Sequence, residues 1–120
     1  MRRSFTDPAD RRTANRWMAI NLAVYGTLRP GESNHAMLDG VPGTWAEGTV
    51  QGVRFIAKGY PAFRPGDGQV PVSVLSSAAL PEHWARLDEF EGNDYRRILV
   101  PVTLTTGAIV VANLYAYIAP

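Results

Sequence analysis

The chain has 120 residues, which is enough for one domain with a single hydrophobic core. Hydrophobic residues make up 46% and charged residues 19%, a globular composition, and the net charge of +1 gives no field that favours nucleic acid or an acidic membrane as a partner. The absence of cysteine excludes disulfides, thiolate nucleophiles and cysteine-bound zinc, and two histidines are too few for a histidine-rich metal site.

The N-terminal segment is basic. Residues 1–16 hold five arginines and two aspartates, a net charge of +3, which leaves about −2 for the remainder (+1 minus +3). We predict a flexible basic tail at 1–17 and one domain at 18–120. The start lacks the apolar centre of a signal peptide, and no apolar stretch reaches the roughly 20 residues of a membrane helix, so we expect a cytoplasmic protein. A tail that binds nucleic acid or a protein partner is a less favoured alternative.

The first half of the domain predicts two strands around a short helix. Residues 19–25 are apolar and partly β-branched, which indicates a buried strand that ends at a turn rich in breakers. A short helix is expected at 34–38. Residues 45–58 are typical of a strand or a broken strand pair, with Gly48 and Gly52 at bulges or at points of close approach.

The second half predicts a loop, a strand, a helix and a hairpin. Residues 59–68 are rich in glycine and proline and favour a loop, and 70–75 favour a strand. The segment 80–92 favours a helix, with a proline in its first turn. Residues 95–104 and 108–118 form a predicted hairpin around Thr-Thr-Gly. Because strands dominate, we predict an α+β fold: a small, mixed but mostly antiparallel β-barrel with short flanking helices.

One carboxylate interrupts the apolar face of the predicted helix. At about 100° per residue, Leu80, Trp84 and Leu87 share a face with Glu91, while Glu89 lies opposite and faces water. A carboxylate on an inward face must be paired, protonated or used in chemistry. Glu91 is therefore the first candidate for a catalytic residue.

The periodicity alone also allows a structural role for Glu91. In that role its carboxylate pairs with Arg96 or Arg97, or accepts from a backbone N–H, and periodicity by itself favours this reading. Asp88, on the flank of the same helix, is expected to be solvated, as is Glu89.

The turn that follows the first strand is a candidate anion site. Gly26 lacks the Cβ that would keep a ligand away from the backbone, and successive N–H groups in such a turn can converge on a carboxylate. A tight turn between a strand and a helix needs the same glycines, so a purely structural role fits equally well. The turn is not a P-loop, because the Gly-Lys-Ser/Thr ending is absent.

Four segments occur in order along the chain: VYGTLRPG at 24–31, GYPAF at 59–63, LDEFEG at 87–92 followed by Tyr95 and Arg96, and a closing strand with Tyr115. Together they span residues 22–118 and resemble the γ-glutamylcyclotransferase-like superfamily, which includes the γ-glutamylamine cyclotransferases and the plant AIG2-like proteins. The resemblance implies a mixed β-barrel with flanking helices and a cavity lined by the Tyr-Gly-Thr-Leu turn.

The resemblance also implies a reaction. In enzymes of this family the turn backbone holds the substrate's carboxylate, and the glutamate of the FEG piece, which corresponds to Glu91, is the general acid/base. A γ-glutamyl amine or γ-glutamyl amino acid would release 5-oxoproline by attack of its own amine, with no cofactor and no metal. Burial should raise the pKa of Glu91 toward neutrality.

We expect the substrate to be contacted by the turn and by aromatic residues of the strands: Tyr25, Gly26, Thr27, Leu28, Tyr60, Pro61, Tyr95 and Tyr115. The expected partner is a small γ-glutamyl molecule, with no nucleic acid and no membrane, and the protein is expected to be a monomer or a homodimer. The main alternative is a non-catalytic domain of the same fold that binds a small metabolite. The sequence leaves the specific substrate open.

Overall fold

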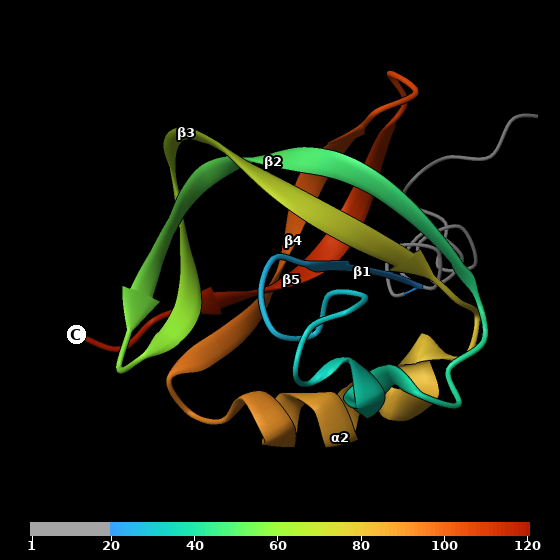
Figure 1. Ribbon diagram of the computed structural model, residues 1–120, viewed down its shortest axis with the longest axis horizontal. Coiled ribbons are helices and arrows are strands. Elements are labelled where there is room, and N and C mark those ends of the chain that lie inside the picture. The colour runs from blue at the N-terminus through green and yellow to red at the C-terminus, as the bar shows by residue number, and fades with distance from the viewer. Residues whose placement is uncertain (1–19) are drawn as a thin grey trace, which may run out of the picture.

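The computed structural model describes residues 20–120, so the predicted basic tail at 1–17 lies outside the described residues. The described part contains five strands, one α-helix and one short 3₁₀ helix (Figure 1). In chain order these are β1 (Asn21–Val24), the 3₁₀ helix η1 (His35–Leu38), β2 (Thr44–Ala57), β3 (Tyr60–Ser76), α2 (Leu80–Glu91), β4 (Tyr95–Leu104) and β5 (Ile109–Tyr117).

The five strands close into a barrel in the order β1-β3-β2-β4-β5. All neighbouring pairs are antiparallel except β1 and β5, which run parallel and close the barrel through the pair Leu22 and Asn113. This confirms the predicted α+β fold with a mixed, mostly antiparallel barrel. Helix α2 and η1 lie next to each other on one side of the barrel, close to β1 (Figure 1).

Strand β1 is buried on both faces because it lies between two apolar clusters. Ala23 faces the barrel interior, which is filled by residues such as Phe63. Leu22 and Val24 face the other way and pack with Leu80, Trp84 and Leu87 of α2 in the second cluster. A strand buried on both faces explains the continuous apolar run of its sequence.

The predicted loop at 59–68 is wrong, because these residues belong to the long strand β3. Residues 60–64 pair with 53–57 of β2, which makes the two strands a long hairpin. On its other side β3 pairs with β1 only at 73–76. Pro61 and Pro65 therefore lie on a stretch of β3 that has one neighbouring strand, and an edge of this kind tolerates residues without an N–H.

Gly48 and Gly52 of β2 both lie close to atoms of neighbouring strands, as predicted. The register shifts between Gln51 and Val53, which places a bulge at Gly52. A Cβ on Gly52 would lie 2.3 Å from ring atoms of Phe63, and a Cβ on Gly48 would lie 2.6 Å from the carbonyl oxygen of Thr103. The bulge bends β2 while the buried Phe63 ring occupies the space of the missing side chain.

The remaining elements agree with the prediction. Helix α2 begins with Leu80 and Pro81 in its first turn, and β4 and β5 form the predicted hairpin. The 3₁₀ helix η1 replaces the short helix, and the Asn34 side chain does not cap it. Within the described range, no helix has both the length and the apolar character to span a membrane.

Candidate active site

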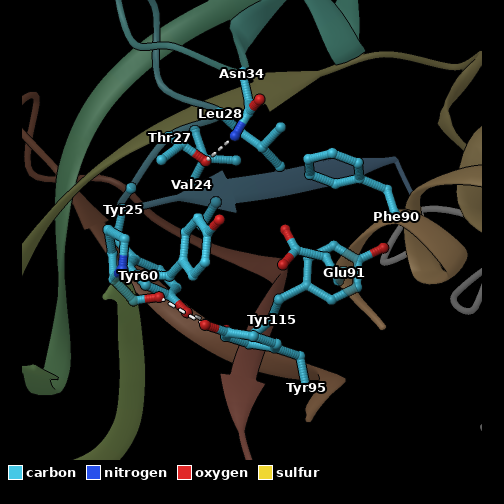
Figure 2. A pocket seen from close by; sticks show the side chains of 13 residues that line it. Val24, Tyr25, Thr27, Leu28, Asn34, Tyr60, Phe90, Glu91, Tyr95 and Tyr115 are labelled. Carbon is cyan, nitrogen blue, oxygen red and sulfur yellow. Dashed lines mark hydrogen bonds between the residues drawn. The ribbon is translucent and has the colours of Figure 1, made fainter. Parts of the chain in front are cut away.

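A cavity of about 370 Å³ opens between the end of β1, the start of β3 and the C-terminal end of α2 (Figure 2). Its volume is in the range of small-molecule sites. All nine predicted site residues line it: Glu91, Tyr25, Gly26, Thr27, Leu28, Tyr60, Pro61, Tyr95 and Tyr115. The sequence therefore predicted nine of the thirteen residues that line the cavity, and the role of each stays a prediction.

Four lining residues were not predicted: Ala23, Val24, Asn34 and Phe90. Ala23 and Val24 directly precede the turn, and Phe90 is part of the FEG segment, so a local signal for these three was present. Asn34 had no such signal. Its side-chain Nδ2 donates to Thr27 Oγ1 at 3.0 Å, a contact that depends on how the chain folds back after the turn.

Glu91 is the last residue of α2 and its carboxylate is directed into the cavity (Figure 2). The predicted apolar face is observed, because Leu80, Trp84 and Leu87 are all buried. Glu91 is half-buried, and its carboxylate has no hydrogen bond or ion pair with any residue of the range 20–120. Burial raises its pKa from 4.5 to about 7. Both protonation states are thus accessible near neutral pH, as a general acid/base requires.

The predicted alternative, in which Arg97 pairs with the helix-end carboxylate, is not observed. Arg97 Nε instead donates to Asp88 Oδ1 at 3.0 Å, and its guanidinium lies 4.2 Å from the centre of the Trp84 ring. Asp88 also accepts the hydroxyl proton of Tyr115 at 2.6 Å. Asp88 is exposed to solvent, as predicted, but it also connects α2 with both β4 and β5, a role that was not predicted.

Three tyrosines of the cavity donate their hydroxyl protons to the protein. Tyr25 donates to the carbonyl oxygen of Tyr115 at 2.6 Å, Tyr95 to that of Pro61 at 2.9 Å, and Tyr115 to Asp88. Burial is the main cause that raises the pKa of all three hydroxyls above its ordinary value. These groups remain protonated at neutral pH, so their oxygens can only accept further hydrogen bonds.

The turn after β1 presents unpaired backbone donors. The amide groups of Gly26, Thr27 and Leu28 have no acceptor among residues 20–120. The carbonyl of Thr27 accepts from the N–H of Asn34 at 2.9 Å, which fixes the turn. A Cβ on Gly26 would lie 2.9 Å from Cβ of Pro61, so only glycine allows this approach to β3. Unpaired N–H groups in a cavity wall favour an anionic ligand.

The site carries no arrangement of side chains that is typical of a metal centre. Within 20–120, no three histidine or carboxylate side chains come close enough together to hold an ion. The cavity places the titratable carboxylate of Glu91 across from the backbone donors of the turn.

The sequence profile of the family described as "Gamma-glutamyl cyclotransferase, AIG2-like" matches residues 22–120. The chain belongs to this family. An uncharacterized protein of Pyrococcus horikoshii is 30% identical, with a TM-score of 0.64 over 84% of this chain and 80% of that one. An AIG2-like protein of Mus musculus is 25% identical, with a TM-score of 0.61 over 84% of this chain and 80% of that one.

A further solved structure is described as a gamma-glutamyl cyclotransferase. It is 18% identical, with a TM-score of 0.63 over 82% of this chain and 66% of that one, and at this identity the likeness concerns the fold alone. No curated protein matches the chain. The resemblance identified from the sequence segments is therefore confirmed at the level of family and fold.

Proposed function

We propose that this protein is a γ-glutamyl cyclotransferase that releases 5-oxoproline from a γ-glutamyl amine or γ-glutamyl amino acid. The observation that carries the proposal is the unpaired, half-buried carboxylate of Glu91, with a pKa of about 7, at a cavity that also contains unpaired backbone donors. Membership of the family supports the reaction class.

The proposed reaction is intramolecular. The α-amine nitrogen of the γ-glutamyl group attacks its own γ-carbonyl carbon, a carbon–nitrogen bond forms, and the bond from that carbon to the leaving amine breaks. The α-nitrogen loses two protons, one from the ammonium before it attacks, because the charged form cannot attack, and one after the new bond has formed. Glu91 takes each proton in turn and passes it to the leaving nitrogen, which departs as an amine and ends as an ammonium. Since nucleophile and electrophile belong to one molecule, much of the rate comes from folding the substrate into a reactive shape, and no co-reactant is needed.

The turn after β1 binds the substrate in this mechanism. The N–H groups of Gly26, Thr27 and Leu28 hold the α-carboxylate, because they have no other acceptor among residues 20–120. Tyr60 and Pro61 close the cavity from the side of β3. The bound α-carboxylate orients the α-amine toward Glu91, which is on the other side of the cavity.

The test is release of 5-oxoproline from a panel of γ-glutamyl amines and γ-glutamyl amino acids. We expect release by the wild type, and a loss of about 100-fold or more in Glu91→Gln, which keeps the shape of the side chain but cannot transfer the proton. Glu89→Gln is the matched control, because Glu89 is exposed on the opposite face of the same helix. Circular dichroism checks that both variants are folded.

Two results would contradict the proposal. Normal turnover by Glu91→Gln would show that another group transfers the proton. No release from any substrate, together with a saturable increase in Tm on adding one of them, would favour the alternative of a binding domain without catalysis.

A further inference from the structure

The peptide groups that carry the unpaired donors of the turn are fixed through their carbonyl groups. The carbonyl oxygen of Gly26 accepts from the N–H of Arg29 at 3.1 Å, and that of Thr27 accepts from the N–H of Asn34 at 2.9 Å. All peptide bonds in the range 20–120 are trans, and the C=O and N–H groups of a trans peptide point in opposite directions. These two bonds therefore fix the directions of the N–H groups of Thr27 and Leu28.

The third peptide of the turn is fixed by a side chain. Nε of Arg54 donates to the carbonyl oxygen of Tyr25 at 3.1 Å, and the N–H of the same peptide is that of Gly26. Tyr25 and Gly26 line the cavity, with Tyr25 across from Glu91 (Figure 2), but Arg54 does not line it. The carbonyl is thus bonded to a group outside the lining, and the N–H is directed the opposite way, toward the place of a ligand.

The hairpin of β2 and β3 brings Arg54 to this carbonyl. Arg54 pairs with Phe63 of β3, and the Phe63 ring packs against that of Tyr25, with 5.7 Å between the ring centres. The bulge at Gly52 lies just before this pair, and a bulge changes the direction of the side chains next to it. Arg54 forms no ion pair with any residue of the range 20–120, so the bond to Tyr25 is the one hydrogen bond of its guanidinium within that range.

We propose that Arg54 is a positioning residue of the anion site, which holds the peptide between Tyr25 and Gly26 so that the Gly26 N–H binds the substrate's α-carboxylate; this inference rests on the proposed function. Arg54 acts from outside the cavity and does not touch the substrate. A cation that donates to a carbonyl also polarises the peptide, which makes the N–H of that peptide a stronger donor. Of the three bonds that fix the turn peptides, this is the one that a substitution can remove, because the other two donors are backbone groups.

A matched pair of probes tests the link between Arg54 and the carboxylate. The proposed product 5-oxoproline and 2-pyrrolidinone are the same ring with and without the carboxylate. NMR titration of isotope-labelled protein measures the Kd of each probe and the downfield shift of the Gly26 amide proton. We expect Arg54→Gln to raise the Kd of 5-oxoproline by about tenfold and to reduce that shift, while the Kd of 2-pyrrolidinone changes by less than about twofold. An equal loss for both probes would overturn the inference, because a merely structural role weakens both.

Arg64→Gln is the matched control for the loss of a positive charge. Arg64 is exposed on the same hairpin, where it pairs with Val53, and its guanidinium lies over the ring of Phe55 and not at the turn. This variant should bind both probes as the wild type does. Arg54→Lys keeps the charge and a donor on a flexible stem and should recover part of the affinity for 5-oxoproline. Equal losses in Arg54→Gln and Arg64→Gln would overturn the inference, because a long-range field would then explain the effect.

The kinetic counterpart is a rise in KM. Since the α-carboxylate is bound in the ground state and in the transition state alike, Arg54→Gln should raise KM for a γ-glutamyl substrate about tenfold, with kcat changed by less than about threefold. Unchanged KM, together with an unchanged Kd for 5-oxoproline, would overturn this inference and leave the proposed function intact. Release of 5-oxoproline from no γ-glutamyl compound, together with no binding of 5-oxoproline to the wild type, would overturn both.

Discussion

Glu91 makes the stability of the protein depend on pH in a definite direction. Burial raises its pKa from 4.5 to about 7, so the folded state binds the proton more tightly than the unfolded state. Below pH 4.5 both states are protonated and there is no penalty. As the pH rises from 4.5 through 7, the unfolded chain ionises first, so the free energy of unfolding falls. Above pH 7 the loss is complete, at about 1–3 kcal/mol.

Replacing the ionisable carboxyl group of Glu91 should stabilise the protein at alkaline pH. Relative to wild type, we expect Glu91→Gln to gain about 1–3 kcal/mol in the free energy of unfolding at pH 8, and to lose most of that advantage at pH 5. Urea unfolding at the two pH values measures this. Glu89→Gln is the control and should follow the wild type at both. An advantage of Glu91→Gln that is the same at both pH values would show that its charge is not the cause.

At the scale of single residues, the sequence identified some members of the site and missed the contacts of others, and the difference has a physical reason. Glu91 could be predicted because the helical period alone places it on the face of Leu80, Trp84 and Leu87. The contacts of Asp88 could not be predicted, because its partners come from two strands that follow the helix. A contact of that kind depends on how β4 and β5 pass over α2, which no local pattern describes.

At the scale of elements, Tyr115 connects two walls of the cavity. Its carbonyl oxygen accepts the hydroxyl of Tyr25 at the end of β1, and its own hydroxyl donates to Asp88 on α2. Strand β5 thus fixes the position of the end of β1 relative to the C-terminal end of α2. The position of Glu91, one turn beyond Asp88, follows from this connection.

We expect Tyr115→Phe to lower the free energy of unfolding by about 1–2 kcal/mol, because it removes a hydrogen bond to a carboxylate. Tyr117→Phe is the matched control in the same strand, since the Tyr117 hydroxyl has no hydrogen bond within 20–120 and its ring contacts remain. Urea unfolding of both variants measures the difference. Equal stabilities would mean that the bond to Asp88 contributes nothing.

The elements that were predicted correctly have strong local signals. The hairpin of β4 and β5 consists of two runs rich in β-branched residues around a glycine turn, and α2 has an apolar face of helical period. The segment 59–68 was assigned to a loop because its prolines and glycines usually end strands. They are compatible with β3 only because that stretch has β2 as its single neighbouring strand, and the number of neighbours is a property of the assembled barrel.

At the scale of the whole molecule, the barrel depends on the bend of β2 at Gly52. We expect Gly52→Ala to lower the free energy of unfolding by roughly 2–4 kcal/mol, because the new Cβ would lie 2.3 Å from the ring of Phe63, which is fully buried. Gly66→Ala is the comparison, since its Cβ would meet mainly Cγ2 of the Val53 side chain, at 2.7 Å, and a side-chain end can rotate. Thermal or urea unfolding distinguishes the two, and equal losses would contradict the role of the bulge.

The barrel itself could be expected from the excess of strands, but its strand order could not. Nothing local in the residues of β1 indicates that it lies between β3 and β5, or that it runs parallel to β5. That placement follows from burying both faces of β1 at once, against the barrel interior on one side and α2 on the other. Only the complete set of elements offers such a position.

The contact between β1 and β5 joins the two ends of the described chain. Beyond the single pair of Leu22 and Asn113, it is held by bonds such as that from Asn113 Nδ2 to the carbonyl oxygen of Asn21, 92 residues away. The cavity takes Tyr25 from one of these strands and Tyr115 from the other. During synthesis the cavity therefore stays incomplete until β5 has left the ribosome, because Tyr115 and the strand that closes the barrel against β1 are made last.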